Sequence, residues 1–444
     1  MYTKKIIYLG GSMLATLGFL SVILLLVAVM TKKLTPTVAL IAVPTAMALI
    51  GGFGFEVGGF ITNGIKTIAP TGVMFIFAIL FFGVLSDAGT FDPIIKRIIK
   101  AVGNDPVKIS IGTAILAMLV HLDGSGAVTF LVTIPAVLPL YNAVGMSRSS
   151  LATVVALAAG TMNIVPWGGP TIRASTSLNV PVTELFNPLL IPVIAGLIFV
   201  LVIAGFIGKK EKARIGTIAL ANIESTNLEE DTEKLKLQRP KLFAVNILLI
   251  IAAIGIMISN LLPPQVVFMF AFCLAVVINY PNVKEQRARV DAHAKEALMM
   301  ASVLFAAGAF TGIMKDTGMI TAMSEVIVNL IPTTMGRLLP VITGVLAMPL
   351  SLLFDPDSFY FGVMPVLTST AGQFGVNPIM VGRAAILGQM TTGFPVSPLT
   401  AATFLLTGLA GVDLGDHQKK TIPYAFLVTI VMLVVAVATG AITV

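Results

Sequence analysis

The residues around Asp123 most constrain what this chain can fold into. They place a carboxylate and two glycines between two apolar runs, residues 109–120 and 130–140. Each run is shorter than the ~20 residues that a membrane-spanning helix needs, which predicts a re-entrant hairpin. Irregular backbone survives at membrane depth only beside protein or a water-filled cavity, so an aspartate there indicates a functional site. A turn between two soluble core helices is the alternative, but residues 354–361, with Asp355 and Asp357, repeat the pattern in the other half.

The composition predicts an all-α polytopic membrane protein. Hydrophobic residues make up 57% of the 444 and charged residues 11%, and the mean hydropathy is +0.98, which leaves too little charge for soluble surfaces. The basic residues behind the net charge of +7 flank apolar runs and form no patch with aromatics, so no nucleic acid partner is expected. The single cysteine and three distant histidines show no zinc-type spacing. The lipid bilayer is therefore the expected environment.

The two halves of the chain resemble each other. The pattern Gly83-x-x-x-Asp87 recurs as Gly312-x-x-x-Asp316, and Asp123 maps to Asp355, all at offsets of 229 to 232. The basic loops place the first hairpin on the cytoplasmic side and the second on the opposite side, which predicts two inverted-topology repeats. We expect scaffold helices in residues 1–69, a first repeat in 70–208 and a cytoplasmic linker in 209–241. Further scaffold helices and a basic loop in 242–296 precede a second repeat in 297–444.

Each repeat is expected to contain a re-entrant hairpin and a broken helix. The hairpins are placed at residues 107–140 and 337–370, and the broken helices at 148–177 and 378–411. The breaks are marked by the Pro and Gly of residues 166–170 and by residues 389–400, which are rich in Thr, Ser and Pro. In inverted-repeat transporters such breaks and hairpin tips meet at a central substrate site.

The residues at these tips and breaks are the candidate site. Arg173 offers a planar fork for a carboxylate, next to a half-helix whose free N–H groups attract anions; an arginine that only orients the helix is the alternative. The candidate substrate-binding residues are Ser125, Thr129, Asn163, Gly168, Gly169, Thr171, Arg173, Ser358, Thr391, Thr392, Ser397 and Thr400. Asp123, Asp355 and Asp357 are the candidates for proton or metal coupling, and Asp123 and Asp357 those for contact with a metal that arrives with the substrate.

These motifs resemble the citrate–divalent metal:proton symporter family of the ion transporter superfamily. The similarity rests on residues 122–126 (LDGSG), 164–169 (IVPWGG) with Arg173, 360–365 (YFGVMP), 397–403 (SPLTAAT) and 409–417 (LAGVDLGDH). It implies an elevator-type fold in the bacterial plasma (inner) membrane and proton-driven uptake of citrate complexed with Mg2+ or another divalent cation. It implies no permanently bound cofactor. Ser125 stands where relatives often have a second acid, so the choice of metal stays open.

Two other functions fit the same residues. One is a proton- or sodium-coupled carrier of another organic acid, such as a dicarboxylate or a gluconate-like anion. The other is a cation/proton antiporter that uses only the aspartates, although Arg173 favours an anion. No nucleophile–base pair or phosphate-binding loop points to an enzyme. The oligomeric state is open, with a homodimer as one candidate assembly.

Overall fold

The computed structural model describes residues 11–31, 33–215, 236–259, 261–330 and 332–443, and every regular element in these ranges is helical. The first half contains α2 (Gly11–Met30), α3 (Pro36–Ile50), α4 (Glu56–Asp87), α5 (Asp92–Val102), α6 (Pro106–Val120), η1 (His121–Asp123), α7 (Gly126–Val144), α8 (Arg148–Met162), α9 (Gly169–Leu178), α10 (Val182–Phe186), η2 (Asn187–Leu189) and α11 (Leu190–Ile215). The second half contains η3 (Pro240–Leu242), α13 (Phe243–Ile258), α14 (Pro264–Asn279), α15 (Val283–Asp316), α16 (Met319–Leu330), α17 (Thr333–Arg337), α18 (Leu339–Leu350), the π-helical turn η4 (Ser358–Val363), α19 (Met364–Gln373), α20 (Pro378–Ile386), η5 (Phe394–Val396), α21 (Ala401–Ala410) and α22 (Leu414–Ala438). Within the described ranges, eight helical segments are long and apolar enough to cross a membrane.

The two arms of the first hairpin are longer than the sequence predicted. Asp105 caps α6, where its Oδ1 accepts the N–H of Val107 at 3.0 Å, and a 3-10 turn extends this arm to Asp123. Ser125 caps α7, which begins at Gly126. With 18 and 19 residues, both arms are longer than the apolar runs that predicted them and long enough by length and composition to span a membrane. The added residues are 106–108 and 121–123 on the first arm and 126–129 and 141–144 on the second.

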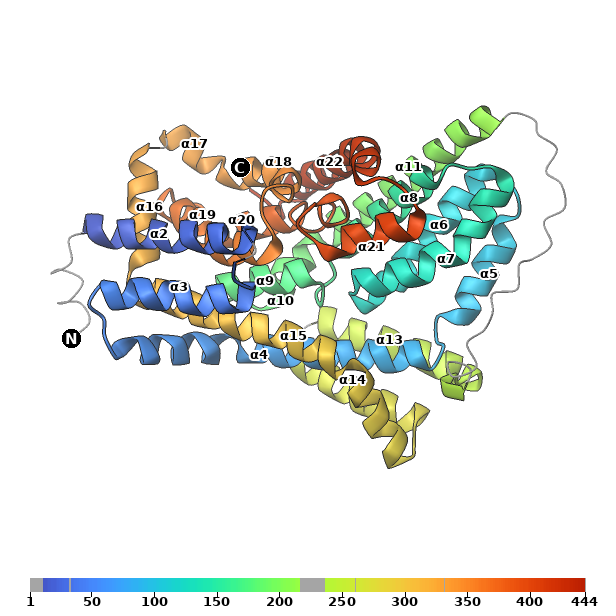
Figure 1. Cartoon of the computed structure of the whole chain (residues 1–444), viewed down its shortest axis with the longest axis horizontal. Coiled ribbons are helices and arrows are strands. Elements are labelled where there is room, and N and C mark those ends of the chain that lie inside the picture. Colours follow the sequence, from blue (N-terminus) through green and yellow to red (C-terminus); the bar gives the residue numbers. More distant parts are fainter. Residues whose placement is uncertain (1–10, 32, 216–235, 260, 331, 444) are drawn as a thin grey trace.

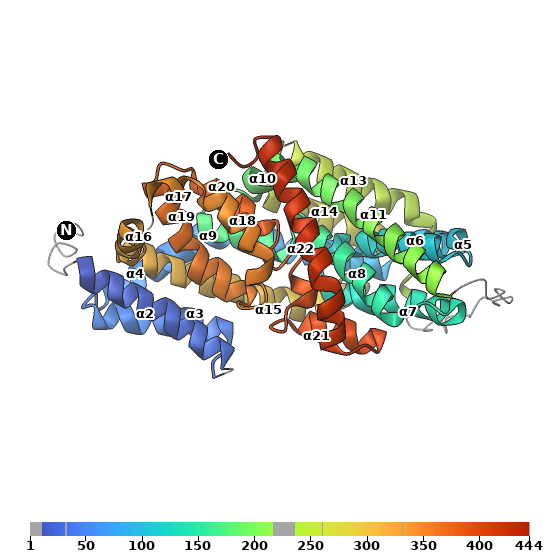
Figure 2. The same ribbon diagram turned by 90° about the horizontal axis from the view of Figure 1, so that it is seen from above.

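The main helices of the two halves correspond in order: α4 with α15, α6 to α9 with α18 to α21, and α11 with α22. Left-handed residues end matching elements: Gly145 and Gly375, with φ of 78° and 76°, follow the hairpins, and Asn179 and Gly411, with φ of 56° and 64°, follow α9 and α21. In Figure 1 the α6–α7 hairpin enters from one end of the long axis and the α18–α19 hairpin from the other, with both tips near the middle. Figure 2 shows the same opposition from above. This is the inverted arrangement that the sequence predicted.

Helices α4 and α15 pack along each other at unusually close range. A Cβ atom on Gly64 would lie 1.9 Å from the carbonyl oxygen of Gly308, and one on Gly312 would lie 2.3 Å from that of Phe60. Glycine is required at both places because any side chain would push the helices apart.

Three of the predicted domain boundaries fall within continuous helices. The boundary at 69/70 lies inside α4, that at 208/209 inside α11 and that at 296/297 inside α15. Helix α11 continues past the apolar region to Ile215 because its last turns carry helix-forming charged residues, with an ion pair of 2.7 Å between Glu211 and Arg214. Residues 216–235 of the predicted linker lie outside the described residues. The division into scaffold and repeats stays a prediction.

The buried side chains form two large cores. One contains side chains of both hairpins, of α8 and of α11, α20, α21 and α22, and we call it the hairpin core. The other contains side chains of α2 to α4 and α13 to α16, and we call it the scaffold core. Trp167, Ile172 and Phe361 belong to the scaffold core, although they lie on the first break, on α9 and on the second hairpin. The residues of the candidate site thus lie where the two cores meet.

Candidate functional site

A cavity of about 490 Å3 lies between the two hairpin tips. Its wall combines both tips and both breaks with parts of α4 and α15 and the start of α3. The predicted site residues that line it are Asp123, Ser125, Asn163, Gly169, Arg173, Asp355, Asp357 and Thr400. They come from four segments that are far apart in the sequence, which is the convergence expected of an inverted repeat.

Arg173 and Asp357 form a buried ion pair across this cavity. The Nε atom of Arg173 donates to Oδ1 of Asp357 at 2.7 Å, and each side chain is 9% exposed. Gly169, at the start of α9, leaves room for the guanidinium, because a Cβ there would lie 2.9 Å from Nη1 of Arg173. The pair joins α9 of the first repeat to the tip of the second hairpin. In this conformation the positive charge predicted to bind substrate is already neutralised.

The aspartates that the repeat relates to each other play the same local role. Asp123 Oδ1 accepts the N–H of Ser125 at 2.8 Å, two residues further along. Asp355 Oδ1 accepts the N–H groups of Asp357 and Ser358, both at 3.1 Å, and the Ser358 hydroxyl donates to its Oδ2. Each carboxylate therefore holds its hairpin tip in a turn while lining the cavity.

Asn163 connects the two breaks. Its Nδ2 donates to the carbonyl oxygen of Met390 at 2.8 Å, and Met390 has a left-handed φ of 53°. Its Oδ1 lies 3.3 Å from Nε2 of His121. Nδ1 of His121 lies 2.8 Å from the Thr129 hydroxyl, and the imidazole is fully buried. The histidine thus positions Asn163 and the first tip.

Several predicted residues lie behind the cavity wall. Thr171 donates to the carbonyl oxygen of Ile164 at 2.8 Å, and the hydroxyls of Thr392 and Thr429 lie 2.6 Å apart. Gly168 must be glycine because a Cβ there would lie 2.2 Å from the Asn163 carbonyl oxygen. The predicted residues that do not line the cavity are Thr129, Gly168, Thr171, Ser358, Thr391, Thr392 and Ser397. Those whose hydroxyls bond to nearby protein groups support the tips and breaks. The spacing of these residues in the sequence does not distinguish this supporting role from a position in the cavity wall.

Apolar residues that were not predicted complete the wall. Phe75 on α4 and Met300 on α15 close it from the scaffold side, and Phe394 contributes from the second break, stacked at 5.9 Å on Phe130. No sequence signal separates these residues from other membrane residues. Trp167, which lies in the first break, donates from Nε1 to the Leu122 carbonyl oxygen at 2.7 Å, which fixes the first tip to the first break.

A metal site made of protein ligands alone is not formed in the described part of the chain. No group of three or more His, Cys, Asp or Glu side chains there could hold a metal ion. The carboxylates that line the cavity come singly from the first tip and as the pair Asp355 and Asp357 from the second. A cation in this cavity would need most of its oxygen ligands from its own substrate or from water.

Comparison with known proteins decides the family. The sequence profile of the citrate transporter family matches residues 25–388. The chain belongs to this family. It is similar to a citrate transporter of Bacillus subtilis (strain 168), with 46% identity over 431 residues that cover 97% of this chain and 100% of the relative. A Mg(2+)/citrate complex secondary transporter of the same organism is 42% identical over 434 residues, with the same coverage.

A solved structure shows the same fold. The YdaH transporter of Alcanivorax borkumensis, described as having an unusual topology, superposes with a TM-score of 0.55 at 14% identity, covering 86% of this chain and 87% of that one. The family and its bacterial relatives identify a transporter rather than an enzyme. With eight candidate spans among the described residues, it is a multi-pass protein of the bacterial inner membrane. The predicted family, fold class and location are confirmed.

Proposed function

We propose that this protein takes up citrate as a complex with a divalent cation, by symport with protons. The observation that carries the proposal is the Arg173–Asp357 ion pair in a cavity that holds two further aspartates. The charged side chains of the wall are three carboxylates and one guanidinium, a formal sum of −3 + 1 = −2 when all are ionised. Bare citrate, with a charge on each of its three carboxylates, would be repelled.

A divalent cation supports entry because it removes two of the three charges of citrate. Mg2+ keeps several waters and binds through a few carboxylate oxygens, so a citrate complex needs little from the protein. Asp123 is the carboxylate that we assign to the cation, because Asp357 is held by Arg173. The N-terminus of α9 and the hydroxyl of Ser125 are the groups for the uncoordinated end of citrate. The relative that transports a Mg(2+)/citrate complex supports the same cargo.

Protons are coupled to citrate uptake because Asp357 and citrate compete for Arg173. A proton on Asp357 removes the charge that holds the guanidinium and leaves the fork free for a citrate carboxylate. Moving a net negative charge inward against an inside-negative potential costs ~2.3 kcal/mol per 100 mV. Two or more protons carried with a monoanionic complex make the transported charge positive, and the potential then drives uptake.

Uptake into proteoliposomes tests the proposal. Radiolabelled citrate is supplied under an inward proton gradient, first in a chelated buffer and then with Mg2+ or Ca2+ restored. We expect slow uptake without metal, recovery with it, and inhibition by a protonophore. Full-rate uptake in the chelated buffer would exclude the metal complex as the transported species and indicate simple proton–citrate symport. A panel of dicarboxylates and gluconate, with and without sodium, distinguishes another organic acid, and metal transport without citrate would indicate an antiporter. The homodimer stays a prediction.

A further inference from the structure

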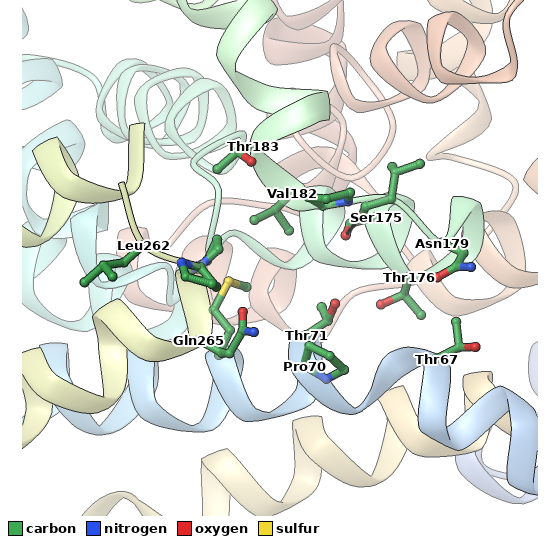
Figure 3. Close-up of a pocket in the computed structure, with 15 residues that line it drawn as sticks. Thr67, Pro70, Thr71, Ser175, Thr176, Asn179, Val182, Thr183, Leu262 and Gln265 are labelled. Carbon is green, nitrogen blue, oxygen red and sulfur yellow. Dashed lines mark hydrogen bonds between the residues drawn. The ribbon is translucent and has the colours of Figure 1, made fainter. Parts of the chain in front are cut away.

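A second polar space lies beside the C-terminal half of α9. It has a volume of about 450 Å3, and Figure 3 shows hydroxyl and amide side chains in its wall beside apolar ones such as Val182 and Leu262. α4 contributes Thr67 and Thr71, α9 and the turn after it contribute Thr176 and Asn179, and the start of α14 contributes Gln265. None of the described residues that line it is charged. The N-terminal half of the same helix lines the first cavity, so α9 separates the two spaces.

The space continues beyond these residues. A neighbouring cavity, also about 450 Å3, shares Thr67, Thr176 and Asn179 with it and extends to Lys315 and Asp316 at the end of α15. The two together form a polar path along the meeting surface of α4 and α9. Between this path and the first cavity lie Ile172, which is 1% exposed, and the Arg173–Asp357 pair.

Two independent features give this space the character of an anion site. The hydroxyl of Thr176 has no hydrogen-bond partner among the described residues although the residue is 4% exposed, and Figure 3 draws its oxygen toward Thr71. Helix α14 begins here after Pro263, which gives no side-chain cap, so its positive end faces the space without a carboxylate or hydroxyl of its own. Pro264 has no N–H, and those of Val266 and Val267 donate to the Pro263 carbonyl oxygen, which leaves the N–H of Gln265 as the helix donor. Gln265 adds amide donors. Hydroxyl, amide and helix N–H donors without an acid select a ligand rich in acceptor oxygens.

We propose that this space is a second station for the transported hydroxycarboxylate, on the far side of the Arg173–Asp357 pair from the first cavity. The proposal rests on the proposed function and adds a second binding position to it. When the pair opens, a carboxylate that leaves Arg173 finds the Thr176 hydroxyl and the α14 N-terminus next. The absence of fixed charge in the wall makes this binding weak, which favours release.

Cysteine labelling tests the second station directly. Cys273 is the only cysteine, so Cys273→Ser provides a background for Thr67→Cys, an exposed position that lines both parts of the path. Thr62→Cys is the matched control, because it is exposed on the same helix and lies outside both walls. We expect citrate with Mg2+ to slow labelling by a small hydrophilic thiol reagent at position 67 severalfold and to leave position 62 unchanged.

A conformational change triggered from the first cavity would also alter labelling, so the test is repeated with Arg173→Ala. We expect protection of position 67 to persist in that variant at higher citrate. Protection that disappears with Arg173, or that is absent from a wild-type background that transports citrate, would overturn the second station while leaving the proposed function intact. Failure of wild-type uptake would instead overturn the proposed function.

A kinetic variant gives a second readout. Thr176→Val removes the unpartnered hydroxyl at constant shape, and we expect the maximal uptake rate to fall about threefold to tenfold with KM for external citrate unchanged. Thr62→Val, whose hydroxyl bonds only to the Gly58 carbonyl of its own helix, should transport at the wild-type rate. An unchanged maximal rate in Thr176→Val would count against the station.

Discussion

Replacing Asp357 by Asn distinguishes the proposed competition of this carboxylate with citrate for Arg173 from a role as metal ligand. The variant keeps an oxygen acceptor 2.7 Å from Nε of Arg173 but removes the charge. The donor is still the charged guanidinium, so the substitution removes the attraction between two opposite charges and keeps a hydrogen bond. Close charge pairs are coupled by about 1.5–7 kcal/mol, and we take the low end, about 1.5 kcal/mol, as the weakening of the pair that citrate must displace. We expect the dissociation constant for citrate to fall about tenfold when measured where Asp357 is ionised in the wild type.

The pH dependence of citrate binding is the stronger test of this competition. Wild-type binding should tighten as the pH falls, because protons release Arg173 from Asp357. The Asp357→Asn variant should lack that part of the dependence, so the two proteins converge at low pH. Titration calorimetry of purified protein, with citrate in the presence and absence of Mg2+, measures both quantities. Asp291→Asn, an exposed carboxylate outside the cavity, is the control for the loss of one charge.

Weaker citrate binding in Asp357→Asn at every pH would refute the competition. If the weakening appeared only with Mg2+ present, Asp357 would be a metal ligand instead. A variant that does not fold gives neither pattern, which is why its thermal midpoint is measured first. Removal of one partner of a buried ion pair costs about 3–5 kcal/mol when no acceptor remains, and the retained amide oxygen keeps the cost well below that.

Three further substitutions test other parts of the structure. Arg173→Lys keeps the charge but loses the fork, so citrate binding should weaken about tenfold at normal expression, and an unchanged affinity would remove Arg173 from the site. Gly64→Ala places a methyl group against a carbonyl oxygen of α15 and should lower the free energy of unfolding by about 1–3 kcal/mol, whereas Gly58→Ala, with nothing within 4 Å, should be neutral or stabilising in the same thermal melt. Trp167→Phe removes the donor to Leu122 and should raise the dissociation constant for citrate by about twofold to tenfold; binding at wild-type affinity would show that this bond does not shape the site.

The sequence predicted the architecture because the features that interrupt membrane helices are chemically distinctive. Aspartates and glycines within apolar runs mark the tips, and prolines mark the breaks, so four separate segments pointed to one site. The repeat was visible for the same reason, since Gly145 and Gly375 both occupy left-handed turns that glycine adopts without strain. Helix lengths were less predictable, because helices such as α6 extend beyond the apolar run that predicts them, here through residues 106–108.

The sequence did not predict which side chains of the site pair with each other. Nothing in the spacing of Arg173 and Asp357 shows that they meet, because their contact depends on how two repeats pack across 184 residues. For a related reason, too many of the Ser and Thr residues in the breaks were predicted to bind substrate. A threonine in a broken helix lines the cavity, as Thr400 does although its hydroxyl donates to the Phe394 carbonyl oxygen, or lies behind the wall, as Thr171 and Thr392 do. The rotation of the helix about its own axis decides between the two positions, and the amino-acid composition of the break does not predict that rotation.

In the proposed proton symport, the contact between Arg173 and Asp357 makes coupling depend on both repeats. A ligand shifts a conformational or protonation equilibrium only by its differential affinity for the two states. If citrate bound Arg173 without displacing Asp357, a proton on Asp357 would not change the affinity for citrate through this pair. Since the guanidinium lies on the first repeat and the carboxylate on the second, each exchange of partner also breaks or restores a bond between the repeats. Proton binding, substrate binding and the relative position of the two hairpins are then linked through one ion pair, and by reciprocity each must respond to the other two.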